Sequence, residues 1–99
     1  MLDVGFAPQP GDRKGLSASQ TSSRVALPTT GKTVIVQVPS GGDVTYVRFG
    51  DSSVTATTDD FVILPGLPYA LNRAPDTQTY IAGICASSET ATVHINCGN

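Results

Sequence analysis

The sequence predicts an all-β protein: a single small β-sandwich or jelly-roll-like domain with an extended N-terminal arm. Between Lys32 and Leu64, three runs rich in Thr, Val, Ile, Tyr and Phe are separated by turn-forming residues, and those side chains fit a pleated surface. No segment of ten or more residues has a capped 3.6-residue apolar period, so no substantial helix is expected. The 99 residues suffice for one core and not for two.

The chain is expected to divide into an arm, residues 1–15, and a sandwich domain, residues 16–99. Prolines and glycines punctuate the arm and leave it few apolar side chains. Such a segment is either a frayed terminus or an extended strap that docks on a neighbouring subunit at little entropic cost. In the second case the partner-binding residues of the arm are Phe6, Pro8 and Pro10.

Seven or eight short strands are expected, a spacing typical of a sandwich or jelly roll. One or two of them are expected in segment 16–27, and Pro28 ends the second. Thr79–Cys85 and Thr90–Cys97 are predicted to form a hairpin across the sequence ASSE. The other predicted strands are Lys32–Val38, Val44–Phe49, Asp60–Leu64 and Pro68–Asn72.

Alternation along these strands predicts which side chains are buried, because successive side chains of a strand point to opposite faces. Tyr46 and Arg48 then face outward together, and the Ser/Thr-rich loop Gly50–Asp59 is expected to be exposed. The predicted core residues are Val36, Val47, Phe49, Ile63 and Val93.

Composition argues against several partners. Only six Lys and Arg residues are scattered along a chain of net charge −2, so no basic stripe for nucleic acid is present. No apolar stretch approaches the length of a membrane span. The N-terminal sequence lacks a secretory leader pattern, so we expect a soluble product made inside the cell. Two cysteines are too few for a disulfide scaffold, and reduced thiols are expected.

Four sequence features suggest chemistry, and each has a simpler interpretation. Gly31-Lys32-Thr33 matches the end of a phosphate-binding loop, but the required earlier glycine is replaced by Ala26 and a strand follows instead of a helix. His94, the single histidine, lies among Thr and Asn on a strand face and is most simply a surface residue. No GxSxG elbow accompanies it, so a small hydrolase is the weakest of the functional hypotheses.

The acidic and thiol side chains also have simpler interpretations. Asp51, Asp59 and Asp60 offer oxygen ligands for calcium but lack EF-hand spacing, which favours a solvated loop. Cys85 and Cys97 are either a redox pair or two small apolar core side chains, and the second reading is favoured. A bond between them is incompatible with the predicted hairpin, and Cys97, near the end of the sequence, could alternatively reach a neighbouring subunit. No cofactor or metal is expected.

The segments FAPQPGD, VALP, VRFGDSSVTATTDDFVILPG and TYIAGICASSETATVHINCGN together resemble a group of small virion proteins of tailed bacteriophages. The recurring motifs correspond to Tyr46–Thr57, Leu64–Gly66 and Thr79–Val93, and they are packing and turn motifs. The resemblance implies a β-sandwich structural protein and transfers no catalytic or ligand residue. Cys85 and Cys97 are not part of the pattern.

The role that the resemblance implies is a decoration or cement protein on the exterior of the capsid, made in the host cytoplasm. Its partners would be the major capsid protein and copies of itself, with a homotrimer as one arrangement, and neither nucleic acid nor membrane. The arm residues together with Tyr46 and Arg48 are the candidate contacts. The alternative is a minor tail- or fibre-associated binding module that uses Tyr46, Arg48, Asp51 and the Ser/Thr loop to contact a host glycan or another virion protein.

Overall fold

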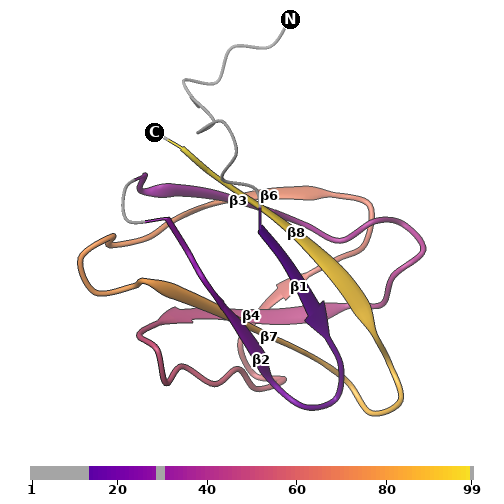
Figure 1. Ribbon diagram of the computed structural model, residues 1–99. Coiled ribbons are helices and arrows are strands. Elements are labelled where there is room, and N and C mark those ends of the chain that lie inside the picture. Colours follow the sequence, from indigo (N-terminus) through magenta and orange to yellow (C-terminus); the bar gives the residue numbers. More distant parts are fainter. Residues whose placement is uncertain (1–13, 29–30, 99) are drawn as a thin grey trace, which may run out of the picture.

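The protein is a sandwich of two four-stranded antiparallel sheets, seen in a computed structural model that describes residues 14–28 and 31–98 (Figure 1). The all-β prediction is confirmed; the described residues contain no helix, and hence none able to cross a membrane. The predicted arm lies outside the described residues except for its last two, which belong to the first strand. The strands are β1 (Lys14–Ala18), β2 (Ser23–Ala26), β3 (Thr33–Gln37), β4 (Thr45–Gly50), β5 (Phe61–Ile63), β6 (Pro68–Asn72), β7 (Tyr80–Cys85) and β8 (Ala91–Gly98).

The strand order is that of a jelly roll. One sheet runs β1-β8-β3-β6 and the other β2-β7-β4-β5. First pairs with last, second with seventh, third with sixth and fourth with fifth, all antiparallel. This is the pattern of one long antiparallel hairpin rolled into two layers, so the jelly-roll form of the predicted sandwich is the one observed.

The predicted hairpin between the last two strands is wrong. β7 pairs with β2 and β4 in one sheet, while β8 pairs with β1 and β3 in the other. Cys85 therefore lies opposite Thr45, and Cys97 lies opposite Val34. Both strands are central in their sheets and largely buried, so each needs a neighbour on either side. Alternation in the sequence shows which face of a strand is buried but does not identify its neighbours.

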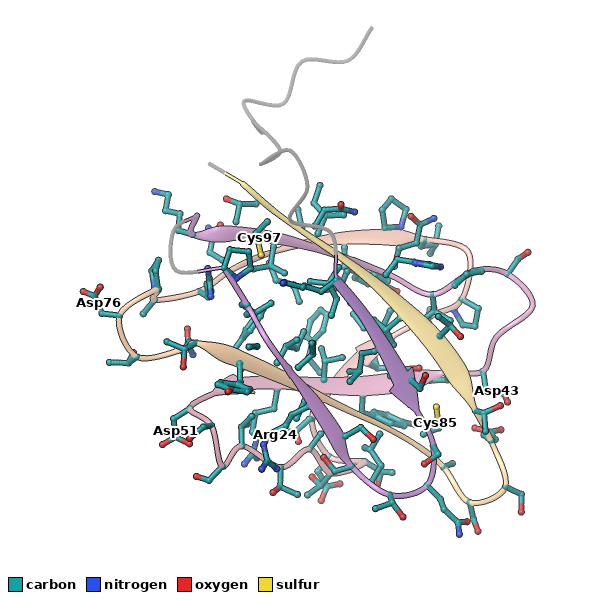
Figure 2. All side chains as sticks on the ribbon, in the orientation of Figure 1. Arg24, Asp43, Asp51, Asp76, Cys85 and Cys97 are labelled. Carbon is teal, nitrogen blue, oxygen red and sulfur yellow. The ribbon has the colours of Figure 1, made fainter. Side chains whose placement is uncertain are left out.

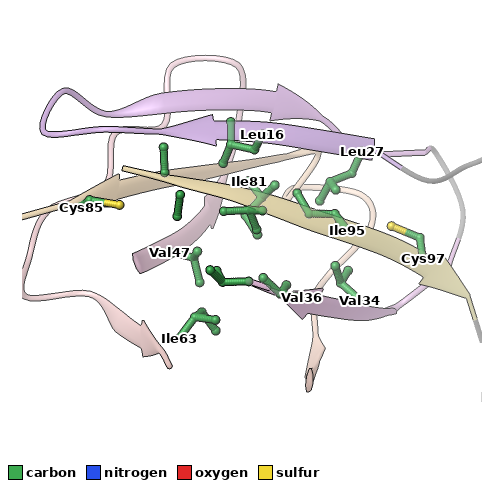
Figure 3. Close-up of a cluster of buried hydrophobic side chains, with 14 residues drawn as sticks. Leu16, Leu27, Val34, Val36, Val47, Ile63, Ile81, Cys85, Ile95 and Cys97 are labelled. Atoms are coloured by element: carbon green, nitrogen blue, oxygen red, sulfur yellow. The ribbon is translucent and has the colours of Figure 1, made fainter. Parts of the chain in front are cut away.

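The core lies between the sheets and is built from their inward faces (Figure 3). β3 and β8 contribute Val34, Val36, Val93 and Ile95 from one layer, and all four are fully buried. Four of the five predicted core residues are at most 3% exposed; the fifth, Phe49, is partly buried and packs against the same cluster. The buried residues of the cluster are Leu16, Ala18, Leu27, Val34, Val36, Val38, Val47, Ile63, Ile81, Cys85, Ala91, Val93, Ile95 and Cys97.

The loop after β4 was predicted to be exposed, and this is wrong for part of it. The loop folds back over the outer face of its sheet. Val54 and Ala56 are buried against Ala82 of β7 in a second small cluster. Gly50 permits this return, because a Cβ there would lie 2.7 Å from a Val54 methyl group. The Ala56 amide donates to the Ser22 hydroxyl at 2.9 Å, which attaches the loop to β2's side of the sheet.

Arg73 is a buried cation that joins two connections between strands. The residue is 5% exposed. Its guanidinium group donates hydrogen bonds to the carbonyl oxygens of Gly31 and Gln78, at 2.9 and 3.0 Å, and to that of Pro28. Its own amide donates to the Lys32 carbonyl at 2.7 Å. Charged donors to backbone carbonyls are among the stronger hydrogen bonds in proteins. The residue therefore fixes the β2–β3 connection against the β6–β7 connection.

The alternation of β8 can be tested with two neighbouring residues. Val93 is fully buried and Thr92 is exposed on the opposite face. Both lose a branched β-carbon on replacement by Ala, so the difference between the two variants reports burial. We expect Val93→Ala to lower the free energy of unfolding by about 1 to 3 kcal/mol, and Thr92→Ala to cost clearly less. Chemical denaturation measures both; equal losses would mean that the register is shifted.

The role of Arg73 predicts a large loss of stability when its side chain is shortened or neutralised. Arg73→Met leaves buried carbonyls without their donor and should cost about 2 to 4 kcal/mol in the free energy of unfolding. Arg73→Lys should cost less, because an ammonium group keeps some of these bonds but lacks the planar fork. Arg24→Met, at an exposed arginine, is the matched control and should stay within about 0.5 kcal/mol. Similar losses at both arginines would contradict the assigned role.

Candidate functional site

The candidate phosphate loop is a turn that leads into a strand, and the histidine lies on the outward face of a strand. Thr33 begins strand β3, so no helix N-terminus follows Gly31-Lys32-Thr33. Gly31 has a positive φ of 94° and its carbonyl receives Arg73, which makes it a turn residue of the buried network. His94 is partly buried on the outward face of β8, as the alternation predicted.

The carboxylates of the β4–β5 loop hold the loop itself. Asp51 Oδ1 accepts hydrogen bonds from the amide and hydroxyl of Ser53, at 2.9 and 2.7 Å. Asp60 accepts from the Thr57 amide at 2.7 Å and forms an ion pair with Arg48 Nε at 2.9 Å. Within the described ranges, no three His, Cys, Asp or Glu side chains are grouped closely enough to hold a metal ion.

Asp51 is the acid whose environment favours its charged form most clearly. The hydroxyl and amide of Ser53 lower the pKa of its carboxyl below the ordinary value of 3.8, and Arg24 contributes more weakly. Arg24 and Asp51 both lie in the lower left part of the molecule in Figure 2. A depressed pKa means that this group's stabilising contribution is present above the ordinary value and is lost as pH falls through the lowered one.

The two cysteines are core residues. Each is a buried residue, 1% exposed and part of the main cluster. They lie at opposite ends of that cluster (Figure 3), and the Cys85 sulfur lies 3.5 Å from the Thr45 hydroxyl. The interpretation as small apolar side chains is confirmed for both, although the hairpin from which their separation was argued is wrong. An intersubunit bond at Cys97 would first require this end of β8 to open.

Tyr46 and Arg48, the candidate partner-binding residues that the structure describes, share the outward face of β4. Tyr46 lies opposite Ile84, and Arg48 lies opposite Ala82, on the neighbouring strand β7. Tyr46 is partly buried, while the Arg48 side chain remains 53% exposed beside Asp60. The structure therefore brings these two together on one face. Phe6, Pro8 and Pro10, the other candidates, lie outside the described residues.

A pocket of about 490 Å³ opens at the end of the sandwich where β1 ends and β8 begins. It offers hydroxyl groups, backbone and small apolar side chains, and none of its lining side chains is ionisable. Such a lining can hydrogen-bond a neutral polar ligand but provides no acid–base pair. The lining residues are Ser17, Ala18, Ser19, Pro39, Gly41, Gly42, Thr90, Ala91 and Thr92.

The most distinctive surface is an apolar edge that the sequence reasoning missed. Among the described residues, every exposed large hydrophobic side chain falls within residues 61–67: Phe61 at 50%, Val62 at 39%, Leu64 at 45% and Leu67 at 53%. They surround the passage from β5 to β6, which are the last strands of their respective sheets. We call this set the apolar edge. The sequence signal was a run of twelve residues, 61–72, without a charge.

The chain matches no protein-family model, no curated protein and no solved structure. The functional reading therefore rests on the surfaces described above and on the sequence resemblance.

The lowered pKa of Asp51 gives a prediction for the β4–β5 loop. Side-chain NMR should show this carboxyl titrating below 3.8, because Ser53 stabilises its charged form. Ser53→Ala should raise the midpoint toward the ordinary value, whereas Ser52→Ala, at the exposed neighbour, should leave it in place. If the titration midpoint of Asp51 is the same in the Ser53→Ala variant as in the wild type, the two hydrogen bonds from Ser53 do not set the pKa.

Proposed function

We propose that this protein is a non-enzymatic structural protein of a tailed bacteriophage that decorates and cements the outer surface of the capsid. The virion assignment rests on the resemblance of its motifs to small phage virion proteins. In the fold, those motifs form β4 with its returning loop, the turn at Leu64–Gly66, and the passage from β7 to β8. They include a central strand of one sheet, the turn that carries part of the apolar edge, and a passage between the two layers.

The observation that carries a protein-binding role is the apolar edge. Single exposed hydrophobic residues are common, but a contiguous group on a small soluble domain marks a contact with another macromolecule. The edge has no charged residue to oppose a protein neighbour, and only 14% of the chain is charged at all, well below the roughly 25% of an average domain. This surface suits burial against protein.

The cementing role depends on many copies of the protein binding to the capsid lattice. Each copy contacts its neighbours through small surfaces: the apolar edge, the face carrying Tyr46 and Arg48, and the arm residues Phe6, Pro8 and Pro10. Many weak contacts on a fixed lattice act at high effective concentration, so the array holds more tightly than any one contact. Lateral links between adjacent capsid subunits would then resist internal pressure.

The pocket favours one alternative, a tail- or fibre-associated module that binds a host glycan. Its neutral hydroxyl lining is able to hydrogen-bond a sugar. The loop groups first considered for that role already serve the fold, because Asp51 is engaged by Ser53 and Arg48 by Asp60. A glycan array with the purified protein tests this reading directly.

Copy number in purified virions tests the main proposal. A cement protein occupies a lattice, so quantitative mass spectrometry against the major capsid protein should give hundreds of copies per particle. A dozen or fewer would assign it to the portal or tail and overturn the cement role.

Rebinding gives a second measurement. Protein lacking residues 2–13 should keep its melting temperature within a few degrees, because all eight strands and the core cluster of the described residues lie in what remains, but should attach more weakly to capsids stripped of this protein. The Ala26→Lys variant, which adds a charge on β2 at the edge of the sheet opposite to β5, is the control. Equally tight attachment of the truncated protein would show that the arm plays no part in binding.

A further inference from the structure

The edge formed by β5 and β6 lacks the protection that sheet edges usually have. Exposed edge strands are normally guarded by charged side chains or covered, because their free backbone groups attract another strand. The opposite edge carries Lys14 in β1 and Arg24 in β2, whereas residues 61–72 carry no charge. Pro65 and Pro68 interrupt this stretch and limit pairing at the start of β6. β5, paired only with β4 among the described strands, remains open.

The apolar edge is held in a defined shape. The Gly66 amide donates to the Val38 carbonyl at 2.8 Å, and the Leu64 amide donates to the Tyr69 hydroxyl at 3.1 Å. The rings of Phe61 and Tyr69 meet edge to face, with centroids 5.8 Å apart. A surface ordered in advance loses little entropy on binding. These contacts therefore present the exposed side chains as a ready docking surface.

The chain itself contains a segment that fits this surface. Leu2, Val4 and Phe6 alternate with smaller or polar residues, so an extended strand of this sequence would place all three on one face. Pro8 and Pro10 follow and cannot continue a ladder. Residues 7–13 would therefore serve as a spacer, about 20 Å long if they had the rise of an extended proline-rich chain.

The spacer joins the domain at Lys14, where β1 begins, and this point is far from β5 of the same copy. β1 and β6 are the two ends of one sheet, separated by β8 and β3, or about 14 Å across. Lys14 also pairs with Ile95, near the Cys97 end of the core, whereas Ile63 pairs with Thr45 near Cys85. Those ends are opposite in Figure 3. Returning to its own β5 would require a diagonal path around a whole layer.

We propose that residues 2–6 of one copy lie as an added strand along β5 of a second copy, with Leu2, Val4 and Phe6 against the apolar edge. Backbone pairing at β5 supplies affinity, and the alternate side chains supply specificity, as in other strand additions. Donor and acceptor surfaces differ, so the contact is head-to-tail and closes into a ring when the rotation allows. The inference concerns contacts between copies and does not depend on the capsid role.

Two charge variants separate the donor from the acceptor. Val4→Lys/Phe6→Lys spoils the arm, and Leu64→Lys/Leu67→Lys spoils the exposed edge. In sedimentation velocity over a concentration series, the wild-type full chain should associate, and each variant alone should remain monomeric. An equimolar mixture has one intact arm facing one intact edge, so it should form a 1:1 dimer and nothing larger. Ala26→Lys, at an exposed position of β2 on the edge of the sheet opposite to β5, should associate like wild type.

Each other result overturns the proposal. A monomeric wild type at all concentrations would mean that no exchange occurs in solution. Association of the arm variant by itself would indicate edge-to-edge pairing. Monomers in the mixture would indicate that an intact arm does not recognise an intact edge.

A synthetic peptide of residues 1–13 provides a readout that does not require the edge variant to fold. It should bind the arm variant, whose edge is intact, and dissociate the wild-type assembly. The same peptide carrying Lys at positions 4 and 6 should do neither. Absence of binding by the unmodified peptide would overturn the proposal independently of the variants, and all of these measurements are made without capsids.

Discussion

The structure depends on one constraint: every strand buries one face against the opposite sheet, and the chain changes sheet at every connection except that between β4 and β5. Each layer is therefore completed by strands distant in sequence, such as β1 with β8 and β2 with β7. The two layers can form only together, because a single sheet would expose its fully buried valines and isoleucines to water. Close packing between them requires small residues where side chains meet. A Cβ at Gly83 would lie 2.8 Å from a Leu16 methyl group.

The same constraint separates what the sequence predicts from what it does not. Alternation identified the inward faces of β3, β4 and β8, because burial acts on each strand separately. Pairing between distant strands is decided by the whole layer, so the adjacent strands β7 and β8 were read as a hairpin although they lie in opposite sheets. The burial of Arg73 was not predicted, for a related reason. Its carbonyl partners at Pro28, Gly31 and Gln78 come from two separate connections, and no local pattern shows that these connections meet.

The candidate site shows a similar division. The outward placement of Tyr46 and Arg48 followed from the alternation of β4, but the apolar edge did not, because strand β5 is too short to establish an alternation. Register places Phe61 on the same face as Val47, yet Phe61 is half exposed while Val47 is buried. The difference comes from position: Val47 has strands on both sides, and Phe61 lies on the last strand of its sheet. Exposure at an edge is a property of the assembled layer.

The two apolar surfaces of the sheet that contains β4 differ in whether the chain covers them. The outer face of β7 carries Ala82 and Ile84, which would form an apolar patch of their own, but the loop bearing Val54 and Ala56 covers it. That loop is held by hydrogen bonds to the side chains of Ser22, Asp51 and Asp60. The chain thus uses its own residues to cover one apolar surface, while the turn between β5 and β6 carries leucines that no described segment covers. A fold that closes one patch internally and holds another in a fixed, open form is suited to assembly through the second.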